Sequence, residues 1–193
     1  MKRRNGGARR FALLLAAACG LGAWCARAEL PPCYVGAGGG LLLPGNGNSL
    51  SRAADVALRA GVYATDFLAW EVEGACAPNV SAHGGHEALT GISARGLHHF
   101  AGFEAFDKLF GCERFDPFMT LGAGTRFGAR HAFADGSHRT ATGPEFGLGA
   151  FYHLTENLDL RVDATALVAC DSPCGMLYAV GVGLQWNFGG FGE

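Results

Sequence analysis

Residues 177–188 read LYAVGVGLQWNF, and this segment decides the fold of the chain. Every second residue from Tyr178 to Phe188 is apolar or aromatic, whereas the residues between them are small or polar. Side chains that alternate with a period of two lie on opposite faces of a β-strand. One face is therefore apolar over about ten residues, the length that a tilted strand needs to cross a bilayer. The aromatic residues Trp186 and Phe188 gather at one end, where a membrane interface favours them.

Seven further segments alternate in the same way, so the sequence predicts eight strands. They cover residues 34–43, 54–63, 67–77, 89–99, 117–128, 144–153 and 158–168. Because an unpaired strand edge is excluded from hydrocarbon, such strands must close on themselves. We therefore expect an all-β fold, an eight-stranded antiparallel up-and-down transmembrane β-barrel.

The connections between these strands alternate in length. Residues 64–66 and 155–157 form tight turns, whereas longer polar links cover residues 44–53, 78–88, 129–143 and 169–175. Short turns at one end and long loops at the other are typical of outer-membrane barrels. The link at 100–116 departs from this rule, because it is long where a short turn is expected. Its Phe103, Phe106, Leu109 and Phe110 fall at helical spacing, so it is either an amphipathic helix at the rim or an insertion beneath the barrel.

The N-terminus has the features of a cleaved signal peptide. A basic stretch that ends at Arg10 precedes an apolar run at 11–24, and Ala26-Arg27-Ala28 matches an A-x-A cleavage signal before Glu29. The apolar run is too short for a membrane anchor helix. Cys19 leaves a lipoprotein signal as an alternative. We expect residues 1–28 to be a cleaved signal peptide and residues 29–193 to be one outer-membrane β-barrel domain.

Export changes the charge of the chain. Residues 1–28 hold six of the 15 Lys and Arg and none of the 17 Asp and Glu, so the remaining 165 residues carry a formal charge of −8. This acidity argues against nucleic acid as a partner.

The same alternation directs ten charged side chains into the barrel. They are Asp55, Arg59, Glu71, Glu73, Arg95, Arg126, Glu145, Asp159, Arg161 and Asp163. Arginine can bind carboxylates with forked hydrogen bonds, so these groups can pair within a narrow lumen. Inward glycines such as Gly122, Gly124, Gly147 and Gly149 leave room for long side chains. We interpret the set as a structural network that fills the barrel; a narrow ion path and a carboxylate active site are the alternatives.

Three segments carry a resemblance to a known family. Residues 56–73 (VALRAGVYATDFLAWEVE), 115–127 (FDPFMTLGAGTRF) and 180–188 are similar to the eight-stranded barrels of OmpA-like and OmpX-like outer-membrane proteins. The resemblance implies an outer-membrane location, surface-exposed loops and contact with membrane lipid. It also implies recognition by the barrel-assembly machinery through the C-terminal aromatic residues Trp186 and Phe188, with residues 189–193 tolerated. The peptidoglycan-binding domain of the OmpA type has no counterpart in this sequence.

Cysteine and histidine give weaker signals. We expect Cys170 and Cys174 to form a disulfide across the last long loop, and Cys33 and Cys112 to be able to pair near the opposite rim, because the exported compartment permits disulfides. Cys76 is left over. His83 with His86, and His131 with His138, could form a surface metal site, but solvated loop histidines are the simpler interpretation, and we predict no metal and no cofactor.

Function follows less directly than fold. The adjacent His98 and His99 invite comparison with lipid-A deacylase barrels, but the required serine is missing. We therefore predict a non-enzymatic outer-membrane barrel with a structural role or a role mediated by its loops, whose ligand the sequence does not identify. The alternatives are a small-conductance pore, a lipid-modifying enzyme and a soluble lipocalin-like barrel with its faces exchanged.

Overall fold

The computed structural model describes residues 32–45, 50–82, 85–100, 114–128, 140–170 and 175–189. These residues form eight strands, which in chain order are β1 (Cys33–Pro44), β2 (Ala53–Thr65), β3 (Leu68–Ala82), β4 (Gly85–His99), β5 (Phe115–Gly128), β6 (Thr140–His153), β7 (Leu158–Ala169) and β8 (Gly175–Phe188). Among the residues described, no helix is long and apolar enough to cross a membrane. The predicted signal peptide and the predicted rim helix fall largely or wholly outside the described residues.

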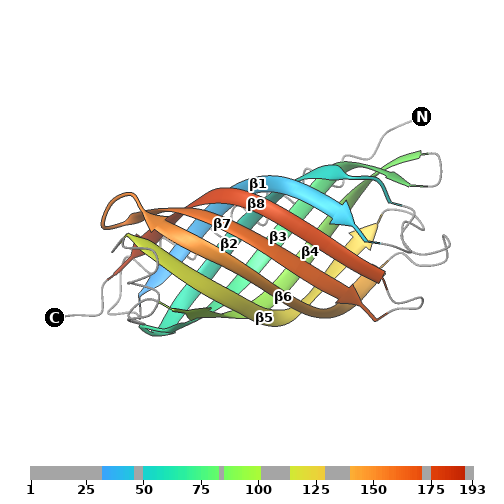
Figure 1. Ribbon diagram of the computed structural model, residues 1–193. Helices are drawn as coiled ribbons and strands as arrows, with labels where there is room; N and C mark the ends of the chain where they lie inside the picture. Colours follow the sequence, from blue (N-terminus) through green and yellow to red (C-terminus); the bar gives the residue numbers. More distant parts are fainter. Residues whose placement is uncertain are drawn as a thin grey trace.

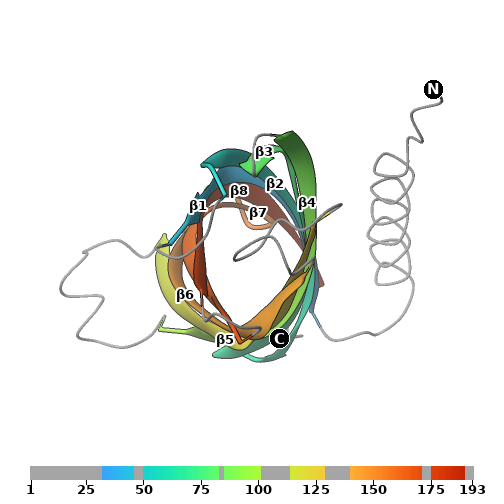
Figure 2. The ribbon, with the colours of Figure 1, turned by 90° about the vertical axis from the view of Figure 1, so that its right-hand side faces the viewer.

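The strands close into a single barrel. Each strand pairs antiparallel with the next one in the chain, and β1 pairs with β8 to close the ring, which Figure 1 shows from the side and Figure 2 along the barrel axis. The closing register runs from the pair Cys33 and Phe188 to the pair Pro44 and Leu177. The predicted fold class is therefore confirmed.

Several strands extend further than their alternation predicts. Most of the link expected at residues 78–88 is strand, because β3 continues to Ala82 and β4 begins at Gly85. A register shift between Ala77 and Val80 hid the continuation, since a bulge interrupts the period of two. Val80 is fully buried beyond the bulge, and this packing supports the longer hairpin.

Strands β6 and β8 also begin earlier than expected, at Thr140 and Gly175. The prediction started β6 at Pro144, which cannot donate to the ladder. The pairing nevertheless continues across it, from Ala123 opposite Pro144 to Phe127 opposite Thr140. One missing donor is therefore tolerated within an otherwise continuous strand.

The two faces of the wall differ as the alternation predicts. Outward side chains such as Leu121, Leu148 and Val182 are more than half exposed, whereas inward side chains are buried. We call the end that carries the β2–β3 and β6–β7 turns the turn end, and the opposite end the loop end. Aromatic side chains are exposed at both ends: Phe67, Trp70, Tyr152 and Trp186 toward the turn end, Phe127 and Tyr178 toward the loop end. An apolar band between two aromatic girdles is the outer surface of a membrane barrel.

Candidate functional site

The structure places all ten of the predicted charged residues inside the barrel, where each is at least nine-tenths buried. They do not form one uniform network. Nine lie in the middle of the lumen, and Asp159 lies apart from them near the turn end, where it binds His153 and Asn187.

Six of the nine form a closed ring of alternating charge, which we call the ion-pair ring. The closest distances between oppositely charged atoms around it are Arg59–Glu73 2.8 Å, Glu73–Arg95 2.5 Å, Arg95–Glu71 2.7 Å, Glu71–Arg161 2.5 Å, Arg161–Asp163 2.7 Å and Asp163–Arg59 3.2 Å. Each charge has an opposite charge on both sides, so the ring is neutral and every member is paired. The members come from β2, β3, β4 and β7, and the ring therefore extends across the lumen.

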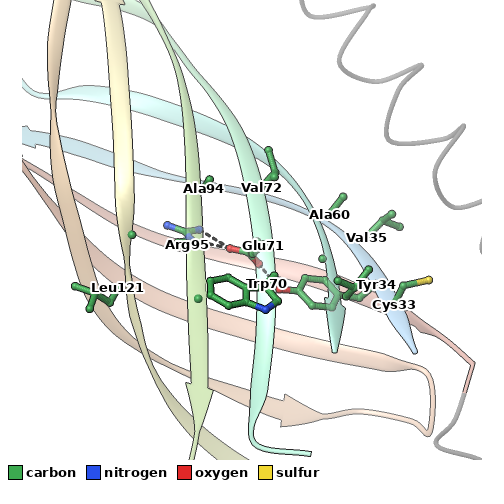
Figure 3. Close-up of a pocket in the computed structure, with 14 residues that line it drawn as sticks. Cys33, Tyr34, Val35, Ala60, Trp70, Glu71, Val72, Ala94, Arg95 and Leu121 are labelled. Atoms are coloured by element: carbon green, nitrogen blue, oxygen red, sulfur yellow. Dashed lines mark hydrogen bonds and ion pairs between the residues drawn. The ribbon is translucent and has the colours of Figure 1, made fainter. Parts of the chain in front are cut away.

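Further groups complete the hydrogen bonds of the ring. Arg95 Nη1 donates to Glu145 Oε1 at 2.7 Å, and the Ser93 hydroxyl donates to the other oxygen of Glu145 at 2.6 Å. The Tyr34 hydroxyl donates to Glu71 Oε2 at 2.8 Å (Figure 3). Buried charges need this kind of satisfaction, because an unpaired ion in a low dielectric costs several kcal/mol. The lumen thus meets the condition under which buried ions are tolerated.

Arg126 and Asp55 also lie in the middle of the lumen, beside the ion-pair ring, but their ion-pair contacts are longer. Arg126 Nη2 lies 4.0 Å from Asp55 Oδ2 and 3.7 Å from Glu73 Oε1, beyond hydrogen-bond length. A void of about 20 Å³ beside Asp55, lined also by Arg59 and Gly181, has room for about one water molecule.

An aromatic layer covers the turn-end side of the ring. Tyr34, Phe118 and Phe151 are 1 % exposed, and they pack with Ala69, Leu97 and the partly buried Tyr63. The Arg161 guanidinium lies 4.9 Å from the centre of the Phe118 ring and 5.3 Å from that of Phe151, so the layer also makes cation–π contacts with the ring.

An aliphatic layer covers the loop-end side. Its buried members are Leu42, Leu50, Ala53, Ala77, Val80, Leu89, Ala141, Leu167, Ala169 and Leu177. Sequence reasoning missed both layers, because it treated the inward face as glycine and charge. The alternation could have revealed them. Leu42, Phe118 and Leu177 fall on the same, inward-facing side of the wall as the charged residues of their own or neighbouring strands.

A polar group of side chains lies at the turn-end mouth. His99 Nδ1 is 2.6 Å from Asp116 Oδ2 and His153 Nδ1 is 2.7 Å from Asp159 Oδ1, so each imidazole binds a carboxylate of a neighbouring strand. His99 Nε2 and Asp116 Oδ1 are buried without a hydrogen-bond partner. Of the adjacent His98 and His99, which invited the comparison with lipid-A deacylase barrels, His99 is buried in the lumen, and its ring stacks on Phe151 with the centroids 5.6 Å apart.

Both predicted disulfides include a cysteine outside the described residues, Cys112 or Cys174, and they stay predictions. Cys33 is buried at the start of β1, Cys76 is half-buried on β3, and Cys170 is exposed after β7. Three of the loop histidines, His83, His131 and His138, also lie outside the described part of the chain. Within that part, no group of three His, Cys, Asp or Glu residues is arranged to hold a metal ion.

The outer wall carries a hollow of about 400 Å³ over β1 to β5. Its outward lining is apolar, with Val35, Ala60, Trp70, Val72 and Leu121 on neighbouring strands (Figure 3). Glu71 and Arg95, also drawn there, point to the other side of the wall, into the lumen.

Known proteins share this architecture, although not at the level of sequence families. No protein-family model and no curated protein matches the chain. Solved structures do: the chain is similar to Neisserial surface protein A (TM-score 0.62, 16 % identity, 81 % of this chain and 97 % of that one). It is also similar to Ail, the attachment invasion locus protein of Yersinia pestis (0.57, 13 %, 82 % and 99 %), and to the outer membrane protein OprG of Pseudomonas aeruginosa (0.59, 12 %, 83 % and 97 %).

These similarities define the class of protein by its fold, that of the small eight-stranded outer-membrane β-barrels. At 12–16 % identity they concern the fold alone. None of them is specific to the OmpA-like or OmpX-like type, so that narrower assignment stays a prediction.

Proposed function

We propose that this protein is an outer-membrane β-barrel with a sealed lumen, which acts structurally or through its loops. The observation that carries the proposal is the closed ion-pair ring, covered on one side by aromatic and on the other by aliphatic side chains, inside a wall that is apolar outside. A lumen filled in this way supports the wall and leaves the loops to make interactions.

The outward surface supports the membrane location. A charged side chain on the lipid face costs about 2–4 kcal/mol near the midplane. The charged residues of β2 to β8 that lie between the two girdles point inward instead. The same arrangement disfavours the soluble lipocalin-like alternative, which would bury the apolar face and expose the charges.

The partners follow from this location. Membrane lipid covers the wall, and the barrel-assembly machinery recognises the C-terminal strand through Trp186 and Phe188. The loops, whose ligand is not identified, provide the interaction surface. Ail, with a similar fold, is named for attachment, which is a role of this kind.

The first test is heat-modifiable migration on a gel after detergent extraction of the envelope. We expect the folded protein to need detergent and to migrate differently before and after boiling, because a closed barrel resists the detergent until it is heated. Solubility in plain buffer, with no change of migration on boiling, would contradict the membrane location.

A second test separates the sealed barrel from the pore. In planar-bilayer recordings we expect no stable conductance steps, because fully buried side chains occupy the lumen. Regular conductance steps from the purified protein would establish the pore instead.

A third test concerns the enzyme alternative. Lipid A from cells with the protein and from cells without it should be identical, and a difference would favour a lipid-modifying enzyme.

A further inference from the structure

The hollow in the outer wall is formed by a local pattern of side-chain sizes. Across the wall, Val62 of β2 lies opposite Trp70 of β3, and Trp70 lies opposite Gly96 of β4. In the next row toward the loop end, Ala60 and Ala94 flank Val72. Small residues on β2 and β4 thus leave space on both sides of β3.

Trp70 forms one wall of the hollow. Its side chain is exposed to the surroundings of the barrel, with a residue exposure of 57 %. A Cβ atom at Gly96 would lie 3.4 Å from Cζ3 of the indole, at ordinary contact distance, so the ring of Trp70 lies beside Gly96 of the neighbouring strand. Figure 3 shows the indole of Trp70 in the hollow.

The space is elongated. A second hollow of about 370 Å³ shares Val72 and Ala94 with the first and continues over β3 to β6 to Thr125 and Thr142 near the loop end. A trough of this shape, apolar along most of its length, fits a chain better than it fits the rounded surface of another protein.

A polar side chain lies next to the turn end of the trough, outside its lining. His98 follows Gly96 by two residues on the same outward face of β4, closer to the turn end. Its ring packs edge-on against Phe100, with the centroids 5.1 Å apart. An imidazole at the edge of the apolar band can donate a hydrogen bond to a phosphate.

We propose that the trough binds a diacyl phospholipid, with one acyl chain between Trp70 and Ala94 and the phosphate at the level of His98. The inference rests on the proposed membrane location, which surrounds this wall with such lipids. Because lipid tails are as apolar as the wall, the hydrophobic effect contributes little, and close packing must hold the chain. We therefore expect a modest preference, about fivefold over the rest of the surface, which corresponds to about 1 kcal/mol.

The two exposed tryptophans provide the assay. Trp70 lines the trough, whereas Trp186 on β8 does not, although both are exposed near the turn end. In the full chain with Trp24→Phe, the variants Trp186→Phe and Trp70→Phe each leave one reporter. Both are placed in detergent micelles that contain a small fraction of phosphatidylcholine brominated along its acyl chains, which quenches tryptophan on contact.

We expect the quenching to reveal an apparent affinity about fivefold higher at Trp70 than at Trp186. Ala94→Leu should abolish this difference by filling the trough. The matched control is Ala164→Leu, also an exposed alanine but on β7, and it should leave the difference unchanged. Heat-modifiable migration of each variant checks that the barrel is folded.

Each of the other outcomes of this experiment contradicts a different part of the proposal. Equal quenching at both positions would overturn the lipid site and leave the membrane location intact. Weaker quenching at Trp70 than at Trp186, with cross-linked dimers, would assign the trough to a second copy of the chain. No quenching at either position, in protein that is soluble without detergent, would contradict the proposed function itself. His98→Ala should lower the affinity at Trp70 alone; an unchanged affinity would remove the phosphate from the proposal.

Discussion

The ion-pair ring and the Arg126–Asp55 pair contain the same kinds of side chain in the same lumen, yet they are held differently. Every charge in the ring has two opposite charges within 2.5–3.2 Å. Arg126 approaches the carboxylate oxygens of Glu73 and Asp55 only to 3.7 and 4.0 Å. Burial alone therefore does not make a strong ion pair; the charged atoms must also come within hydrogen-bond distance of each other.

This difference follows from the register of the strands and from the narrow lumen. Arg59 lies directly opposite Glu73 on neighbouring strands, and the same register pairs Glu71 with Arg95. Glu71 and Arg161 are 90 residues apart in the chain, and they meet because β3 and β7 lie on different sides of a narrow lumen. Arg126 instead lies over Gly91 of the adjacent strand β4. Substitutions in the two regions should therefore have unequal effects.

The largest effect is expected for Arg95→Ala, because it removes a partner from Glu71, Glu73 and Glu145 together. Leaving buried charges uncompensated should lower the free energy of unfolding by about 4 kcal/mol. Arg126→Ala is the matched comparison and should cost less, about 2 kcal/mol, since its contacts with Asp55 and Glu73 are 3.7–4.0 Å long. Urea unfolding in detergent micelles, followed by tryptophan fluorescence, measures both. Equal losses in the free energy of unfolding would mean that the ion-pair ring is no tighter than the Arg126–Asp55 pair.

Loss of one acid should have a smaller effect. Glu71→Gln keeps the shape of the side chain but removes the charge that faces Arg95 and Arg161, and we expect a loss of about 3 kcal/mol. Asp55→Asn should cost less, about 1 kcal/mol, because the ion-pair contact with Arg126 is 4.0 Å long and the amide oxygen can still accept the hydrogen bond from the backbone of Val56. The same unfolding experiment compares them, and a larger loss for Asp55→Asn would reverse the assignment of strong and weak pairs.

The smallest effects concern the packing around these charges. A Cβ at Gly149 would meet the Phe118 ring and the backbone oxygen of Val162, so Gly149→Ala should cost about 2 kcal/mol through overpacking. A Cβ at Gly91 would meet only the Arg126 side chain among its three nearest atoms. Since that side chain has only long ion-pair contacts and can shift, Gly91→Ala should cost less, about 1 kcal/mol. Thermal shifts in gel migration rank the two variants, and equal shifts would show that Arg126 is fixed after all.

Much of the fold was predictable because a strand has a strict period of two. Residues such as Glu71 and Val72 are assigned to opposite faces by their order alone, and the need to pair every edge in hydrocarbon requires closure. The same reasoning failed around Ala77–Val80, where a bulge breaks the period, and around Pro144, where a turn residue lies inside a strand. Predictions at residues 1–28 and 100–116 remain open.

By itself the sequence determined which side chains face inward and that eight strands form one closed wall, because alternation is a local property of the backbone. Only the tertiary structure decided that Arg59, Arg95 and Arg161 share three carboxylates in a ring and that Asp159 lies apart from them. It alone decided that Trp70 lies beside Gly96 over a hollow. The physical reason is that these contacts depend on the stagger between strands, which sets the height of each residue in the barrel and which no single strand encodes.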